Sequence, residues 1–308
     1  HEFLEKKDIG RFTFKTVGNR AVRQAISNLN PSEATGLDGI AVKWLKRFIH
    51  TLTSFMRHIL NRTILTSEYP ERYKAGCISP LPKKGDLKQI KNWRPVTLLS
   101  TCSRVVERVL NGQMKGYLEA YKLLPPQQHA YRRGKSVVSA WSDLDFFVAR
   151  ARDEGRHVSM LAQDMSSAFD TVDASVIIPK LKMMGFEEGA LSLVGNYMRG
   201  RTNRTRVQNH VTGPRHVYTG IGQGSVLGPA TFLVCVLDVE VVLQRTRERV
   251  EDMFPELKIK KDDLRLFCVG FADDISGLVD CHDPNIMRAT LTIMSEEYKK
   301  YFTAQGLK

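Results

Sequence analysis

Residues 265–279 have the sequence RLFCVGFADDISGLV, in which two apolar runs flank the acidic pair Asp273 and Asp274. Apolar runs on both sides of a tight turn predict a β-hairpin with the two aspartates at its turn. Adjacent carboxylates repel each other unless a cation offsets their charge, so the pair suggests a metal site. The alternative is ordinary turn chemistry, because aspartate is favoured in turns by hydrogen bonds to its own backbone.

A second acidic segment lies far upstream and favours the metal site. Residues 158–164, VSMLAQD, predict a short apolar strand that ends at Asp164. Three carboxylates at the ends of adjacent strands can hold two divalent cations, which activate an attacking hydroxyl and stabilise a leaving pyrophosphate. Hard oxygen ligands favour Mg²⁺. Asp170 and Asp173 follow the strand and are poorer candidates, and Asp173 suits the N-cap of a helix over 174–184.

The composition favours a polyanionic partner. The 308 residues include 46 Lys and Arg against 33 Asp and Glu, a net charge of +13, which is typical of nucleic-acid binding. A membrane surface is the competing explanation, but no basic amphipathic anchor stands out and no apolar run is long enough to span a bilayer. Five scattered cysteines predict reduced core thiols and an intracellular setting. The chain begins at His1, so we expect a piece of a longer protein.

A basic hairpin is predicted over residues 71–94. Strand-like residues 75–81 and an extended segment from Trp93 flank a turn that presents lysines. Lys83 as a point charge and Arg94 as a bidentate fork could then lie against a triphosphate. A solvated basic hairpin without a ligand is the alternative.

Two further segments mix charge with aromatic or strand character. Tyr131, Arg132, Arg133 and Lys135 suit a nucleic-acid strand, with the charges along the phosphates and the ring stacked on a base. The run 199–206 contributes a second set, Arg201, Arg204 and Arg206, before a strand over 207–218, although a charge-protected edge strand is an alternative for it.

The glycine-rich stretch 220–229, GIGQGSVLGP, precedes an apolar helix predicted over 230–243. Glycine permits close backbone approach to a ligand, and a helix N-terminus offers amides to phosphate. The stretch lacks the surroundings of a dinucleotide fold and the lysine ending of a triphosphate loop. Apolar periodicity predicts other helices over 17–29, 42–64, 101–120, 137–152 and 284–302.

In this order, the motifs resemble the reverse transcriptase of non-LTR (LINE-type) retrotransposons over nearly the whole chain. The blocks that carry the resemblance are 34–40, 81–99 (LPKKGDLKQIKNWRPVTLL), 128–136, 163–172 (QDMSSAFDTV), 199–206, 222–229 (GQGSVLGP) and 271–274 (FADD). One departure is Gly222, where the family usually has proline, which should loosen the loop before Gln223.

The resemblance implies roles for individual residues. Asp164, Asp273 and Asp274 match the catalytic ligands of two Mg²⁺ ions, with Mn²⁺ as an alternative metal, and the Met165 carbonyl matches a further ligand. Phe169 matches the aromatic gate that rejects a ribose 2′-hydroxyl, so the expected product is DNA. The residues that match the nucleotide-binding set are Lys83, Arg94, Phe169, Gln223 and Gly224. The basic segments would contact the template and primer.

The expected fold is α+β: the fingers and palm of a right-hand polymerase, with an antiparallel palm sheet flanked by helices and no thumb before residue 308. We expect a lead-in and fingers over 1–136, a first palm part over 137–171, an insertion with a basic strand over 172–221, and a second palm part over 222–308.

The expected function is RNA-directed DNA synthesis from dNTPs on an RNA template and a DNA primer, without a membrane partner. The family implies a nuclear location. A non-catalytic nucleic-acid-binding remnant or an inactive fragment is the main alternative, and an RNA-templated RNA polymerase is a weaker one, disfavoured by Phe169.

Overall fold

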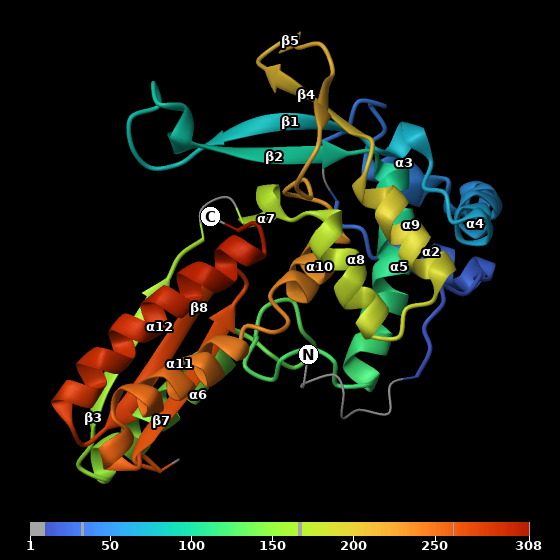
Figure 1. The fold of residues 1–308 in the computed structure, drawn as a ribbon. Coiled ribbons are helices and arrows are strands. Elements are labelled where there is room, and N and C mark those ends of the chain that lie inside the picture. The colour runs from blue at the N-terminus through green and yellow to red at the C-terminus, as the bar shows by residue number, and fades with distance from the viewer. Residues whose placement is uncertain (1–9, 32–33, 166–167, 261, 308) are drawn as a thin grey trace. The chain divides into compact units, whose positions relative to one another are not determined.

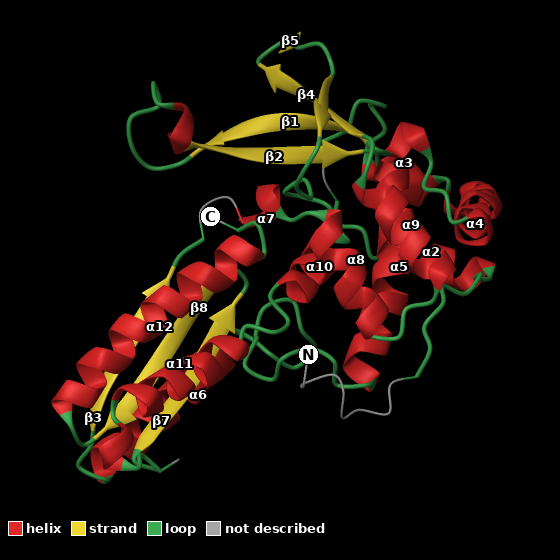
Figure 2. Cartoon of the chain, viewed as in Figure 1, coloured by secondary structure: helices red, strands yellow, loops and turns green. Residues whose placement is uncertain are grey.

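The computed structural model describes residues 10–31, 34–165, 168–260 and 262–307, and has a mixed α+β architecture (Figures 1 and 2). The chain forms two compact units. The carboxylate unit contains residues 124–168 and 235–308, and the hairpin unit contains residues 2–123 and 169–234. Both units are therefore built from segments distant in sequence. The four-part division expected from the sequence stays a prediction.

The carboxylate unit has an antiparallel three-stranded sheet with strand order β3-β8-β7. Helices flank this sheet, as expected, and α12 lies along it in Figure 1. In chain order the elements are α6 (Val137–Asp153), β3 (His157–Gln163), α11 (Val241–Met253), a 3₁₀ turn (Pro255–Leu257), β7 (Leu264–Phe271), β8 (Asp274–Cys281) and α12 (Pro284–Ala304).

Helices cover both faces of this sheet. On β7, Phe267 stacks on Phe147 of α6, with ring centroids 5.6 Å apart, and the next residue, Cys268, is buried on the side of Tyr298 in α12. Successive strand residues point to opposite faces, so α6 and α12 lie on opposite sides of the sheet. Gly277 of β8 lets α12 approach closely, since a Cβ there would lie 2.6 Å from the sulfur of Met294.

The hairpin unit combines helices with a five-stranded sheet of order β2-β1-β4-β5, in which β6 also pairs with β4. Strand β1 is antiparallel to β2 and parallel to β4. The elements are α2 (Asn19–Ser27), α3 (Val42–Arg47), α4 (Ile49–Thr66), a 3₁₀ turn (Glu71–Tyr73), β1 (Ala75–Pro82), a second 3₁₀ turn (Ile90–Asn92), β2 (Trp93–Leu99), α5 (Thr101–Ala120), α7 (Ala168–Thr171), α8 (Ala174–Met183), α9 (Glu188–Met198), β4 (Arg201–Val207), β5 (His210–Val211), β6 (Arg215–Val217) and α10 (Gly228–Cys235); α7 and α10 span the unit boundaries.

Most of the predicted elements are confirmed. The apolar face predicted for the first helix is buried, with Val22, Ile26 and Leu29 at most 1% exposed. The predicted cap is also confirmed, because the Asp173 carboxylate accepts a hydrogen bond from the amide of Ser175 at 2.7 Å. Hydrogen bonds from Ser175 favour the charged form and, together with the charge of Arg199, lower the pKa of Asp173.

Three predicted boundaries are wrong. The helix expected over 42–64 is interrupted at Phe48, and the helix expected over 230–243 ends at Cys235, where the chain leaves the hairpin unit. The strand expected over 207–218 begins earlier, at Arg201, because β4 pairs in parallel with β1, a contact between residues far apart in sequence. Only the short strands β5 and β6 occupy the predicted range.

A buried carboxylate connects α5 to the start of α10 inside the hairpin unit. The side chain of Glu107 is fully buried, and one of its oxygens accepts hydrogen bonds from the amides of Val226 at 2.7 Å and Leu227 at 3.2 Å and from the Tyr197 hydroxyl at 3.2 Å. The other oxygen accepts from the Ser103 hydroxyl at 2.9 Å. Glu107 therefore satisfies backbone donors at the end of the glycine-rich loop, where a negative charge also complements the helix N-terminus.

We expect Glu107→Ala to lower the free energy of unfolding by about 3 kcal/mol, because it removes charge-assisted bonds and leaves buried donors unpaired. Glu107→Gln keeps the volume and should cost less. Denaturant unfolding followed by circular dichroism measures both. A free energy of unfolding for Glu107→Ala equal to that of the wild type would contradict the role assigned to Glu107.

On the same helix, Gly112 has open space around its Cβ position, so Gly112→Ala should raise the free energy of unfolding by up to about 1 kcal/mol.

Candidate active site

The acidic pair lies at the turn between β7 and β8, as predicted. Phe271 pairs with Asp274, so Ala272 and Asp273 form a two-residue turn. Ala272 has a φ of +58°, in the left-handed region that side chains other than glycine rarely adopt. Asp273 is half-buried and Asp274 is exposed at the start of β8. Both carboxylates therefore lie at one end of the sheet.

The pairing of β3 with β8 brings Asp164 to the same end. The two strands are antiparallel, and their last matched pair is Gln163 with Ile275. One step further along this register, Asp164 faces Asp274. Residues directly opposite each other in an antiparallel pair have Cα atoms about 4.5–5.5 Å apart. The predicted convergence of the three aspartates is thus a consequence of strand register.

The electrostatics of Asp274 agree with this placement. Burial raises the pKa of its carboxyl, and the neighbouring charges of Asp273 and Asp164 raise it further. Like charges close enough to perturb one another favour a bound cation, and carboxylate oxygens are the type of ligand that Mg²⁺ prefers. In the described part of the chain, however, no three His, Cys, Asp or Glu side chains are already arranged as a metal-binding group. Coordination by these residues, and by the carbonyl of the buried Met165, stays a prediction.

The first basic segment belongs to the same unit, and only part of it faces solvent. Tyr131 is exposed, and its pKa is raised by partial burial and by the charge of Asp273, which places its ring near the acidic turn. Arg133 is exposed as well. Arg132 and Lys135 instead donate to the backbone carbonyls of Pro125 and Pro126. Tyr131 and Arg133 are therefore the more accessible members.

The start of the matched block 128–136 is not a surface contact. Gln128, His129 and Ala130 are at most 4% exposed, so a contact of these three residues with template or primer, which the resemblance over this block implies, is not supported. The His129 ring lies between the Ser139 hydroxyl, 2.7 Å from Nδ1, and the Asp143 carboxylate, 3.0 Å from Nε2. This segment is part of the interior of the carboxylate unit.

In the hairpin unit, Lys83 and Arg94 lie on the two arms of the predicted basic hairpin. Leu81 is paired with Arg94, and the amide of Lys83 donates to the carbonyl of Asn92 at 2.7 Å. Lys83 follows Leu81 by two residues, so it shares a face with Arg94. Both side chains are exposed. The hairpin thus presents two cations side by side to solvent.

The glycine-rich loop runs along the outer edge of β2. The amide of Thr97 donates to the carbonyl of Gln223 at 2.7 Å. Gly224 has a φ of +116°, and a Cβ there would lie 2.6 Å from the Thr97 carbonyl oxygen. No residue with a side chain fits this position without displacing β2, so Gly224 fixes the path of the loop and with it the backbone of Gln223.

Phe169 lies beside this loop. Its carbonyl accepts a hydrogen bond from the amide of Ile221 at 2.8 Å, and its ring stacks on Phe232 with centroids 5.0 Å apart. The ring is half-buried. Within the hairpin unit the structure therefore brings the predicted gate next to the predicted nucleotide-binding loop.

Asp170, a poor candidate for a metal ligand, belongs to this group through Gln223. The Gln223 side chain donates to its carboxylate at 3.4 Å. Burial raises the pKa of Asp170, and the bond from Gln223 opposes that effect. Asp170 therefore orients Gln223. The position of Asp170 directly after Phe169 indicates that it lies near the nucleotide-binding residues. Its partner Gln223 could not be predicted from local sequence, because the two residues are 53 positions apart.

The second basic segment is divided between interior and surface. Arg201 is 5% exposed, donates to the Tyr197 carbonyl at 3.0 Å, and lies 4.9 Å from the centre of the Tyr197 ring. This burial contradicts an exposed nucleic-acid contact through Arg201. Arg204 is exposed and Arg206 half-exposed, both on one face of β4.

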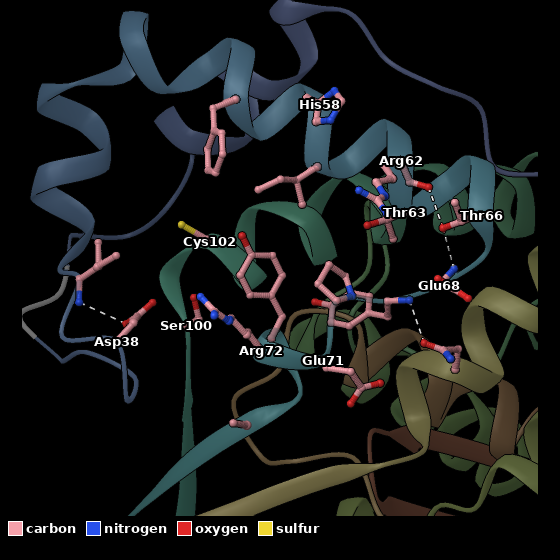
Figure 3. Close-up of a pocket in the computed structure, with 18 of the residues that line it drawn as sticks. Asp38, His58, Arg62, Thr63, Thr66, Glu68, Glu71, Arg72, Ser100 and Cys102 are labelled. Carbon is pink, nitrogen blue, oxygen red and sulfur yellow. Dashed lines mark hydrogen bonds between the residues drawn. The ribbon is translucent and has the colours of Figure 1, made fainter.

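The hairpin unit also contains an open cavity of about 870 Å³ between the loop 37–40, α4 and residues 68–75 (Figure 3). Arg62 and Arg72 line it together with the carboxylates of Asp38, Glu68 and Glu71. The lining includes none of the site residues predicted from the sequence. The mixed charges of the cavity favour no single class of ligand.

Two expectations from composition concern the whole chain. All five cysteines are free, and four of them are buried, as expected for core thiols. Across the ranges that the structure describes, every helix is too short or too polar to cross a membrane.

The chain is similar to known proteins along most of its length. Residues 81–304 match the family model described as reverse transcriptase (RNA-dependent DNA polymerase). A 149 kDa protein of transposon TX1 from Xenopus laevis is 27% identical over 82% of this chain and 19% of its own length. A probable RNA-directed DNA polymerase from transposon BS of Drosophila melanogaster is 26% identical over 73% of this chain and 25% of its own.

A third relative is the retrovirus-related Pol polyprotein of the type-1 retrotransposable element R2 from Popillia japonica, 26% identical over 87% of this chain and 35% of its own length. The chain thus spans about a fifth to a third of these relatives. The family match covers both the acidic turn and the basic hairpin tip. The chain belongs to the reverse transcriptase (RNA-dependent DNA polymerase) family, as a domain of the kind carried by LINE-type retrotransposons.

Proposed function

We propose that this chain catalyses RNA-directed DNA synthesis, the attack of a primer 3′-hydroxyl on the α-phosphate of a dNTP. The observation that supports this most is the β3–β8 register, by which Asp164 comes opposite Asp274, the residue that follows Asp273 in the turn. We assign the carboxylate unit to the palm and the basic hairpin of β1 and β2 to the fingers. Catalysis of this kind depends mainly on positioning and on neutralising charge.

The carboxylates of Asp164, Asp273 and Asp274 would hold two Mg²⁺ ions, with the Met165 carbonyl as a further oxygen ligand. Bound Mg²⁺ would lower the pKa of the attacking hydroxyl and neutralise the leaving pyrophosphate. The protein's own contribution is to hold the three carboxylates on a rigid sheet end, since helices cover both faces of that sheet.

The nucleotide would be bound by residues of the hairpin unit. Lys83 and Arg94 supply two cations on one face of the hairpin for the triphosphate. Phe169 would exclude a 2′-hydroxyl, and Gln223, oriented by Asp170, would contact the nucleotide or template with Gly224. Tyr131, Arg133, Arg204 and Arg206 would contact the RNA template and DNA primer, with Arg132 and Lys135 as supporting cations. A nuclear location, expected from the family, stays a prediction.

Asp273→Asn should abolish primer extension on an RNA template, by at least about 1,000-fold in kcat, because one metal ligand loses its charge. Binding of the primer-template, measured by fluorescence anisotropy, should change less than about threefold. Asp252→Asn on the exposed face of α11 is the matched control and should extend primers normally. Wild-type extension by Asp273→Asn would remove the proposed site and favour a non-catalytic nucleic-acid-binding role.

Phe169→Val should admit ribonucleotides, because the smaller side chain leaves room for a 2′-hydroxyl. We expect the ratio of kcat/KM for dCTP over CTP to fall by at least about tenfold, the size of an effect near 1.4 kcal/mol. Phe55→Val, an exposed aromatic elsewhere in the hairpin unit, should leave that ratio unchanged. Equal discrimination by Phe169→Val and the wild type would show that this ring is not the gate.

The double variant Arg204→Ala/Arg206→Ala should weaken binding of a primer-template duplex and make it less sensitive to salt. Removing two phosphate contacts should reduce the slope of log K against log salt concentration by about 1.5. Arg20→Ala/Arg23→Ala on α2 removes the same charge from another exposed surface and is the matched control. An identical slope for the two double variants would argue against a contact through β4.

A further inference from the structure

Gln128 makes three hydrogen bonds around the acidic turn. The side chain is 4% exposed, and its oxygen accepts from the amide of Ala272 at 3.0 Å and from the amide of Ala130 at 3.1 Å. Its nitrogen donates to the carbonyl of Ala272 at 3.2 Å. One side-chain amide thus binds both the donor and the acceptor of a single backbone residue, as a neighbouring strand would.

Backbone bonds hold Gln128 in this position. The amide of His129 donates to the carbonyl of Gly270 at 2.8 Å, and the amide of Gly270 donates to the carbonyl of Gln127 at 3.0 Å. These bonds form a parallel bridge between Gln128 and Gly270. A Cβ at Gly270 would lie 3.0 Å from the Gln128 nitrogen, so the glycine leaves room for the side-chain amide.

The residue that Gln128 binds is strained. Ala272 has a φ of +58°, a left-handed conformation in which the Cβ of an L-residue crowds the following carbonyl oxygen. The dihedral angles of Ala272 set the direction of the chain at Asp273, the next residue. If Ala272 relaxed to a negative φ, the turn would change and the Asp273 carboxylate would point elsewhere. Hydrogen bonds on both sides of Ala272 oppose that relaxation.

We propose that Gln128 is a positioning residue, which holds Ala272 in its left-handed conformation and thereby aims the Asp273 carboxylate. This role rests on the proposed function, in which Asp273 is a metal ligand. Gln128 acts through the backbone of the turn, because its side-chain hydrogen bonds go to backbone groups of Ala272 and Ala130. The same segment continues to Tyr131 near Asp273, so the support of the turn and the accessible basic residues belong to one short stretch of chain.

The test uses Gln128→Met, which keeps the length and burial of the side chain but cannot make the three bonds. We expect kcat for primer extension to fall at least tenfold and the Mg²⁺ concentration for half-maximal rate to rise several-fold. KM for dNTP and affinity for primer-template should stay within about twofold of wild type. A purely structural role would lower the folded fraction without shifting the Mg²⁺ dependence of the molecules that remain folded.

Gln127→Met is the matched control. Gln127 contributes its backbone carbonyl to Gly270, whereas its side-chain oxygen has no hydrogen-bond partner among the described residues. This variant should keep wild-type kcat and Mg²⁺ dependence. A wild-type Mg²⁺ dependence in Gln128→Met, or an equal shift in both variants, would overturn the proposal.

A second substitution tests the mechanism through Ala272. Glycine adopts a positive φ without strain, so Ala272→Gly in the Gln128→Met background should recover at least part of the lost kcat. Absence of any recovery would overturn the proposed route through Ala272. If Gln128→Met does not fold, Gln128→Asn replaces it, because its amide is one methylene too short to span both bonds. Wild-type values in that variant would also overturn the proposal.

Asp273→Asn in the same assay separates the two hypotheses. If Asp273→Asn is inactive while Gln128→Met has wild-type kcat and Mg²⁺ dependence, the positioning role of Gln128 is wrong and the proposed function stands. An active Asp273→Asn removes the proposed function, and with it the reason to aim this carboxylate.

Discussion

The register between β3 and β8 is the constraint on which the candidate site depends. Successive strand residues point to opposite faces, so a slip of one residue would turn Asp164 to the other side of the sheet from Asp274. The two strands are matched without a break from His157 with Cys281 to Gln163 with Ile275, so such a slip would have to re-pair the whole ladder. The continuous pairing of β3 with β8 therefore determines where Asp164 and Asp274 meet at the end of the strands.

The aspartates at the two ends of this sheet differ in whether cationic side chains neutralise them. At one end Asp280 is 1% exposed and is paired with Arg156 at 2.6 Å and with Arg265 at 2.9 Å. At the other end, no described cationic side chain forms an ion pair with Asp164, Asp273 or Asp274. A buried carboxylate needs cationic partners, whereas carboxylates without such partners at the end of the strands are suited to bind a cation from solution.

Local pattern predicted the parts of the site that depend on local sequence. The strand before Asp164 and the turn at Asp273 follow from apolar runs and turn residues, and both are confirmed. Pattern could not predict that Arg201 is buried, because β4 pairs in parallel with a strand more than a hundred residues away. The local pattern also could not predict that Asp170 accepts a hydrogen bond from Gln223, or that Gln128 binds the acidic turn. The partners are 53 residues apart in the first case and 144 in the second.

The acidic turn at Ala272 and the glycine-rich loop at Gly224 are held in the same physical way, although they lie in different units. Each contains a residue in the left-handed region, Ala272 in one and Gly224 in the other, and each is held by buried polar groups from distant segments. Gln128 binds the first loop, and Glu107 binds the end of the second. A buried polar side chain that loses its partners is costly, so at these positions stability and loop geometry change together. The exposed cations of the basic hairpin lack that coupling, and their substitution should alter binding while leaving the fold intact.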